Sequence, residues 1–131
     1  MDCRFAFLCL EAEPNGRQVD AVGIGIEEAL AERLPVLIPL TFVVSVSYSR
    51  FEAGQKSLVV GCMGEDGEPV VEPMGGPMDF PIPESGIDGT QTFVFEMPDA
   101  TFPAYGRYTF YLTVDGLQMA RASFAVSPLS N

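Results

Sequence analysis

Histidine is absent from this chain, and lysine occurs once, at Lys56. Imidazole is the commonest general base and the commonest metal ligand, so its absence removes the usual basis of hydrolytic and metal-assisted catalysis. The acidic pairs Glu11/Glu13 and Glu65/Asp66 fall on predicted turns, where carboxylates are ordinary solubilising surface. A glycine loop of the phosphate-binding type is also missing. We therefore expect no enzyme activity, no catalytic residues and no cofactor.

Basic residues are few, with 7 Lys and Arg against 18 Asp and Glu, which gives a formal net charge of −11. Such a surface repels phosphate backbones and anionic lipid headgroups, so neither nucleic acid nor a membrane is an expected partner. The stretch Met1–Leu10 lacks the basic start and the length of a signal peptide. A cytoplasmic location is therefore expected.

Cysteine occurs three times, an odd number that argues against the disulfide framework of a secreted domain. Cys3 and Cys9 lie about 20 Å apart if they share one extended strand, too far for a disulfide bond. We expect Cys3, Cys9 and Cys62 to be free thiols, buried on inward strand faces and slow to react.

The most regular pattern lies near the C-terminus, where polar and apolar residues alternate from Arg107 to Val114. Asp115-Gly116 then supplies a two-residue type I′ turn, so this region predicts a β-hairpin. Similar signals predict strands at Cys3–Leu10, Val19–Ile26, Ile38–Arg50 and Thr90–Met97, and a hairpin over Ser57–Pro73. With 131 residues, the chain is expected to form one domain over residues 1–131. The fold class is all-β, an immunoglobulin-like two-sheet antiparallel sandwich of about seven to eight strands with one short helical turn.

The first two strands are expected to pair through a turn over Glu11–Gln18, and both of their faces are apolar. One face needs a cover outside the core. In Ile26–Leu34 the apolar residues recur at helical spacing, which predicts one or two helical turns before Pro35. This segment folds back as the cover, or it docks on a partner through Leu30 and Leu34.

Proline and glycine are frequent between Glu72 and Gly89. Prolines exclude a central strand, so a long surface connection is expected here, with at most a short edge strand around Met78–Ile82. Four apolar side chains make this connection a candidate partner-binding surface, unless they pack over one end of the sandwich. They are Met74, Met78, Phe80 and Ile82.

The turn Glu65–Glu68 carries clustered carboxylates, which suggests calcium. A calcium loop needs oxygen ligands at several set positions, and this short turn offers few. A solvated turn explains these residues equally well, and the sequence leaves open whether the turn binds a cation. No other metal site is expected.

Two details of the C-terminal hairpin lead to specific predictions. Tyr108 precedes an inward-facing Phe110 by two residues, as in the corner of immunoglobulin-like folds where a tyrosine hydrogen-bonds back to the chain. Continuous pairing from the Asp-Gly turn would place Arg121 in the core. A β-bulge near Ala120-Arg121 would avoid this burial and keep Phe124 inward.

The order of these motifs resembles a bacterial family of unknown function that is similar to immunoglobulin-like sandwiches. The stretches that carry the resemblance are FAFLCLEAEPNGRQVDAVGIG, GEDGEPV and PAYGRYTFYLTVDG, which together extend over nearly the whole chain. Arg17-Gln18-Val19 and Ala104-Tyr105 depart from the family's usual Lys-Leu and Pro-Gly. The resemblance implies a fold but no catalytic or binding residues.

Two functions remain open. The first is an intracellular binding or scaffold module that contacts a protein partner or a second copy of itself. The second is a small-ligand or carbohydrate-binding sandwich, for which Phe102, Tyr105 and Tyr111 are the only aromatic cluster. The absence of tryptophan makes this alternative the weaker one.

Overall fold

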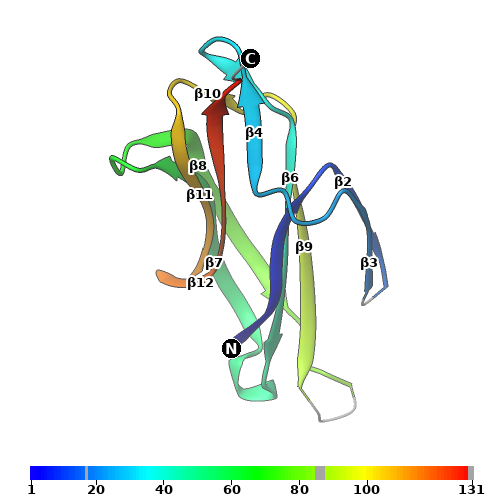
Figure 1. The fold of residues 1–131 in the computed structure, drawn as a ribbon. Coiled ribbons are helices and arrows are strands. Elements are labelled where there is room, and N and C mark those ends of the chain that lie inside the picture. Colours follow the sequence, from blue (N-terminus) through cyan, green and yellow to red (C-terminus); the bar gives the residue numbers. More distant parts are fainter. Residues whose placement is uncertain (17, 85–87, 130–131) are drawn as a thin grey trace.

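The computed structural model describes residues 1–16, 18–84 and 88–129, and nearly all of its regular structure is β-strand (Figure 1). Residue 17 of the predicted turn, residues 85–87 of the predicted connection and residues 130–131 of the predicted domain lie outside this part. The strands are β1 (Asp2–Cys9), β2 (Glu11–Asn15), β3 (Gln18–Val22), β4 (Glu28–Ala31), β5 (Val36–Leu37), β6 (Leu40–Tyr48), β7 (Gly54–Gly64), β8 (Pro69–Phe80), β9 (Gly89–Met97), β10 (Thr101–Phe102), β11 (Gly106–Val114) and β12 (Leu117–Pro128).

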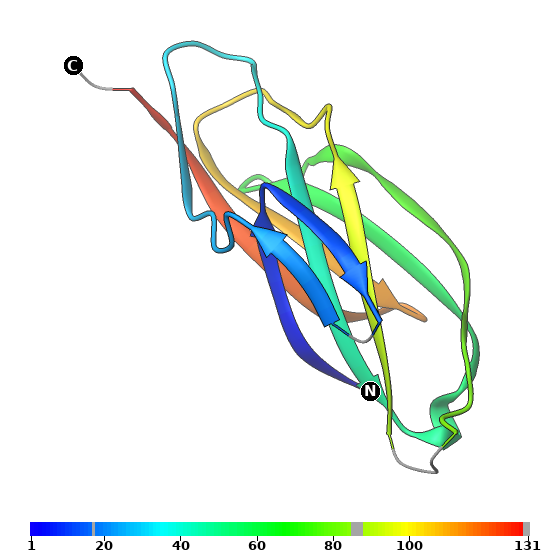
Figure 2. The same ribbon diagram turned by 90° about the vertical axis from the view of Figure 1, so that its right-hand side faces the viewer.

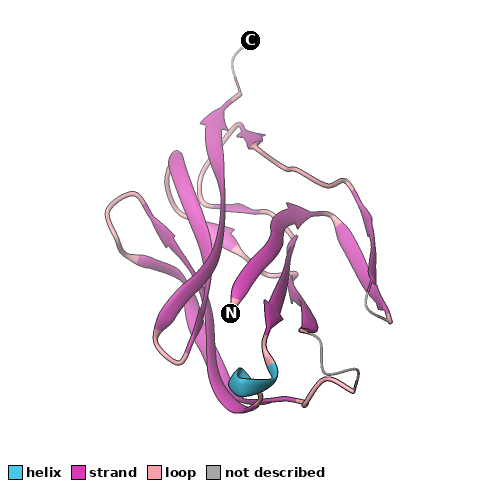
Figure 3. Ribbon diagram, turned by 90° about the horizontal axis from the view of Figure 1, so that it is seen from below, coloured by secondary structure: helices cyan, strands magenta, loops and turns pink. Residues whose placement is uncertain are grey.

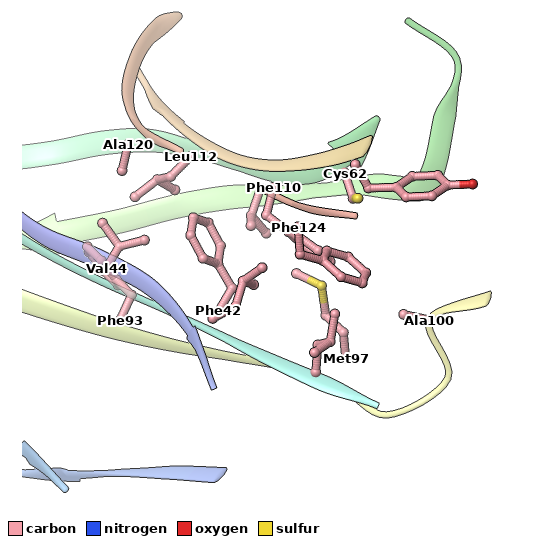
Figure 4. Packing of buried hydrophobic residues seen from close by; sticks show 14 of the residues in the cluster. Phe42, Val44, Cys62, Phe93, Met97, Ala100, Phe110, Leu112, Ala120 and Phe124 are labelled. Carbon is pink, nitrogen blue, oxygen red and sulfur yellow. The ribbon is translucent and has the colours of Figure 1, made fainter. Parts of the chain in front are cut away.

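Two sheets face each other across the main core. One has three strands in the order β1-β6-β9, and the other has five in the order β4-β12-β11-β7-β8. Alternate residues of a strand point to the same side, and in β11 these alternate residues are apolar and buried, so the inner face is apolar. Phe42 of β6 packs against Phe110 of β11 with ring centroids 5.9 Å apart, and Phe110 packs against Phe124 of β12 at 6.2 Å (Figure 4). The predicted all-β fold with antiparallel sheets is confirmed.

The strand β6 is buried on both faces, which explains why its sequence is so continuously apolar. Its second face contributes Val43 to a smaller cluster with Cys9 and Ala12. A hairpin of β2 and β3 covers this cluster, and Figure 2 shows the hairpin lying over the sheet. The cover expected from Ile26–Leu34 is therefore provided by residues 11–22 instead.

The predicted pairing of the first two strands was wrong. β1 pairs with β6, and most of the segment expected to be a turn forms the strand β2. Gly16 follows β2 directly, and its φ of 63° suits a tight turn. The Asn-Gly signal was correct, but the turn is shorter than expected.

The helix predicted over Ile26–Leu34 was also wrong, because this segment contains the strand β4. β4 runs parallel to β12, and the Ala125 N–H donates to the Glu27 carbonyl oxygen at 2.9 Å. An isolated helix of two turns is poorly stable in water, whereas the edge of β12 offers ready hydrogen-bond partners. In the described residues the only helical turn is a 3₁₀ turn at Arg50–Glu52 (Figure 3).

The proline-rich segment is more regular than expected. The strand β8 spans twelve residues at the edge of the five-stranded sheet and pairs with β7 through the acidic turn at residues 65–68. Its prolines are compatible with this position because an edge strand needs donors on one side only.

The predicted type I′ turn and the predicted β-bulge of the C-terminal hairpin are both confirmed. Asp115 and Gly116 have φ values of 49° and 83°, as a type I′ turn requires. The ladder shifts between the pairs Leu112–Ala120 and Thr113–Gln118, so Met119 is the extra residue of a bulge. This bulge lies next to the predicted position and leaves Phe124 fully buried.

The Tyr108 corner is also present. Its hydroxyl donates to the Ala104 carbonyl oxygen at 2.5 Å and accepts from the Ala104 N–H at 3.1 Å.

The three cysteines are free, but only Cys9 and Cys62 are buried. Cys3 is exposed, so its predicted burial was wrong. A register shift between Cys3 and Phe5 adds one residue to β1, so Cys3 is out of phase with Phe5 and lies outside the cluster against which Phe5 and Phe7 pack. Within the described chain, no helix is long and apolar enough to cross a membrane.

Candidate functional site

A groove of about 650 Å³ lies beside the β2–β3 hairpin, where it meets the ends of β6 and β9. The hairpin stands beside β9 at the side of the molecule (Figure 1). Ala12 and Ala21 face each other across the hairpin and line the groove. Their side chains face the smaller cluster around Cys9 and Val43, where Ala12 is buried and Ala21 is partly buried.

Leu10 and Val22 form an apolar rim at the base of the hairpin. Both line the groove, and they remain 59% and 62% exposed. The Leu10 N–H donates to the Val22 carbonyl oxygen at 3.0 Å, which holds the two chain segments together. Gly23 follows with a φ of 71°, and a Cβ there would lie 2.7 Å from Leu10 Cγ. This close approach therefore requires glycine.

Four carboxylates also line the groove: Glu11, Glu13, Asp20 and Glu96. Glu13 and Asp20 lie directly opposite each other in the β2–β3 ladder, an arrangement of like charges that destabilises a sheet. Asp20 accepts a hydrogen bond from Asn15 Nδ2 at 3.2 Å. Neither of the two salt bridges in the described part of the chain includes any of these four carboxylates.

Thr41 adds a buried polar group to the groove. It is 5% exposed, and its hydroxyl donates to the Leu10 carbonyl oxygen at 3.4 Å. Thr41 also pairs with Glu96 across β6 and β9. The groove thus combines an apolar rim with negative charge, an arrangement suited to binding a group that is both apolar and cationic.

The residues predicted to bind a partner do not form one surface. Met74, Met78, Ile82 and Leu30 are exposed as expected. However, Leu30 lies on β4 and Met74 and Met78 lie on β8, at opposite edges of the five-stranded sheet.

Two residues of that predicted set are less exposed than expected. Phe80 is fully buried and packs edge-on against Tyr48, with ring centroids 5.1 Å apart. Leu34 is partly buried against the main core. Phe80 ends the strand β8 facing inward, so its exposure was wrongly predicted from the assumption of a loop.

The acidic turn uses its carboxylates within the protein. Glu65 accepts a hydrogen bond from the Arg107 backbone N–H at 2.8 Å, and Asp66 accepts one from the Glu68 N–H at 3.0 Å. These bonds fix the hairpin between β7 and β8. In residues 1–16, 18–84 and 88–129, no cluster of three or more Cys, Asp or Glu side chains is arranged to hold a metal ion.

The aromatic residues considered for a small ligand are not gathered on an open face. Phe102 is fully buried, and Tyr105 donates its hydroxyl to the Ala31 carbonyl oxygen at 3.0 Å. Tyr111 is half-buried, and its hydroxyl lies against Gly61.

The groove was missed from the sequence because residues 11–18 were interpreted as a turn. A signal was available. Charged and small apolar residues alternate in Glu11-Ala12-Glu13, and Asp20-Ala21 repeats the charged and small pair on the other side of Asn15-Gly16. This is the pattern of a short β-hairpin with one covered face.

These features define the chain as an all-β protein of face-packed, largely antiparallel sheets with an open, acidic groove at its side. It belongs to a family of unknown function, DUF6941, whose model matches residues 4–127. This match confirms that the sequence motifs indicated a family of unknown function. No curated protein matches the chain.

Proposed function

We propose that this protein is a binding module without enzymatic activity that holds a segment of a partner protein in the groove beside the β2–β3 hairpin. The observation that carries this proposal is the groove itself, with a volume of about 650 Å³ and an exposed apolar rim at Leu10 and Val22. Binding sites for ligands are typically concave and of this size.

The composition of the groove favours a protein segment over a sugar. Of the described residues that line it, none is aromatic, whereas sugars stack on exposed rings. Leu10 and Val22 instead offer contacts for aliphatic side chains. The carboxylates offer hydrogen-bond acceptors for amide and ammonium groups.

We also propose an intracellular location for this interaction. Cys3, Cys9 and Cys62 are free thiols, and thiols persist in reducing compartments. Exposed Cys3 in particular would be open to oxidation outside the cell.

Site-specific photo-crosslinking tests the proposed function. A photoreactive amino acid replaces Val22 at the groove, and a second variant carries it at Leu117, which is 70% exposed in the β11–β12 turn. Both variants are irradiated in cells that naturally make the protein. We expect a discrete protein adduct from position 22 that is missing from position 117. Identical adducts from both positions, or none from position 22, would refute the proposal.

A further inference from the structure

The partner segment can be assigned a chemical class from the charges and apolar contacts of the groove. We infer that it is an extended basic segment that presents both lysine or arginine and aliphatic side chains on one face. This inference rests on the proposed function, since it names the partner of the same groove.

The charge of the groove is the first step. Glu11, Glu13, Asp20 and Glu96 line it, and no lysine or arginine is among the described lining residues. The whole chain carries a formal net charge of −11, so the surrounding field has the same sign. Long-range attraction therefore favours a cationic partner and speeds its association.

The second step is a pair of opposed carboxylates in the β2–β3 hairpin. Glu13 faces Asp20 directly, and neither carboxylate forms a salt bridge in the described part of the chain. Such an opposed pair is unfavourable in the free protein. A cationic side chain placed between the two carboxylates would remove this repulsion. The repulsion would thus be present in the free protein and relieved in the complex, which favours binding.

The apolar rim gives the second requirement. Leu10 and Val22 leave more than half of their surface exposed beside the carboxylates. A uniformly basic segment would not cover them, and a uniformly apolar one would leave the carboxylates without partners while desolvating them. In an extended segment side chains two residues apart point to the same side, so basic and aliphatic residues at every second position can both face the groove.

A second copy of the chain does not meet these requirements. Its own net charge of −11 would repel the groove, and its basic residues number only 7. The acidic groove would likewise repel nucleic acid and anionic membranes, because both are negatively charged. A basic segment of another protein is the occupant that the groove fits.

Titration with synthetic peptides followed by NMR tests this inference. Three extended peptides of about 12 residues are compared: a Lys-Leu peptide that repeats Lys-Ser-Leu-Ser, a Lys-Ser peptide that repeats Lys-Ser-Ser-Ser, and a Glu-Leu peptide that repeats Glu-Ser-Leu-Ser. We expect the Lys-Leu peptide to shift the backbone amides of Ala21, Val22 and Glu96. The Lys-Ser peptide should bind more weakly, and the Glu-Leu peptide should not bind. Raising the salt concentration from about 50 mM to about 300 mM should weaken Lys-Leu binding several-fold.

Charge variants provide the matched control. Glu13→Gln with Asp20→Asn should weaken Lys-Leu binding by about tenfold, because two charge contacts are lost. Glu32→Gln with Glu72→Gln changes the net charge by the same amount at exposed positions away from the groove, and should change binding by less than about twofold. Glu13→Gln with Asp20→Asn should fold normally, because it removes the repulsion between the two carboxylates.

The outcomes separate this inference from the proposed function. An equal loss of binding in both double variants, or amide shifts away from the groove, would show non-specific charge attraction and overturn the inference. A groove adduct from position 22 together with no binding of the Lys-Leu peptide would overturn the basic partner but leave the binding module. Peptide binding at the groove without any cellular adduct would instead count against the proposed function.

Discussion

Glu13 and Asp20 lie directly opposite each other across the β2–β3 ladder, beside the groove. Like charges in this position destabilise a hairpin, and natural sheets usually place opposite charges or polar residues there. The pair therefore reduces the stability of a segment that also covers the second face of β6. A site that binds a cation is a place where such a loss is expected, because binding sites often reduce stability.

The first prediction is that Glu13→Gln stabilises the protein. Removing one charge of the pair should raise the free energy of unfolding by about 0.2–1 kcal/mol, with the smaller values at high salt. Urea unfolding of the variant and the wild type measures the change. Glu72→Gln on β8 is the control and should have little effect. A loss of stability in Glu13→Gln would mean that the carboxylate has a favourable partner.

The second prediction concerns the corner at Tyr108. Its hydroxyl forms two hydrogen bonds with the backbone of Ala104, so Tyr108→Phe should reduce stability by about 0.5–1.5 kcal/mol. Phe110→Ala should reduce it by about 3–5 kcal/mol because it leaves a cavity in the main core. Chemical denaturation of both variants gives the comparison. Equal losses would show that the corner bond contributes as much as a core ring.

Patterns that depend on near neighbours in the chain could be interpreted correctly from the sequence. The Asp115-Gly116 turn, the alternation of β11 and the cost of burying Arg121 are all local, and together they determine the hairpin and its bulge. The strand β9 was found in the same way. The hairpin of β7 and β8 could be placed from its Asp-Gly turn, although the length of β8 was underestimated.

Features that depend on distant neighbours could not be predicted in this way. β4 forms because β12, which follows it by about a hundred residues, offers an open edge, and nothing within Ile26–Leu34 indicates that edge. The extra residue in β1 puts Cys3 out of phase with Phe5, and nothing in the local sequence indicates this shift. The groove arises where the hairpin meets β6 and β9, so it required the three-dimensional arrangement.

The third prediction is that the three thiols react at very different rates. Cys3 is exposed, whereas Cys9 and Cys62 are buried. Burial raises the pKa of Cys62 to about 12, so almost none of it is thiolate at neutral pH. Alkylation of the native protein should therefore label one cysteine first, and Cys3→Ser should remove this rapid phase. Rapid labelling of Cys62 without denaturant would contradict its place in the core.

The fourth prediction is a pH dependence at Glu52. Its carboxylate accepts hydrogen bonds from the Met1 ammonium group at 2.6 Å and from the Ser49 N–H at 2.9 Å, and these bonds lower its pKa below the ordinary value. A carboxylate with a lowered pKa stabilises the fold above its unfolded-state pKa, and this contribution is lost as the pH falls through the folded-state value.

We therefore expect Glu52→Gln to lower the Tm at neutral pH, with the difference from the wild type shrinking in acid. Thermal unfolding across this pH range measures the difference. Glu84→Gln serves as an exposed control that should follow the wild type. A difference that stays constant down to the most acidic pH would show that the charge of Glu52 is not involved.

The last prediction concerns the free edge of β8. Pro77 lies opposite Ser57, whose backbone N–H and carbonyl both pair with Asp115 on the other side of β7. The Ser57–Pro77 pair is therefore one without ladder hydrogen bonds, and the Pro77 nitrogen faces the open edge. Because proline has no N–H, it removes a donor that another strand would use.

Pro77→Thr should restore this donor without breaking a bond to β7, so the fold should persist while the protein begins to self-associate through β8. Pro77→Lys adds the same donor with a charge that opposes strand pairing, and it should associate no more than the wild type. Light scattering coupled to size-exclusion chromatography, over a range of protein concentrations, distinguishes the two variants. If Pro77→Thr behaves like Pro77→Lys, the proline does not limit strand addition, and another feature of the edge must prevent it.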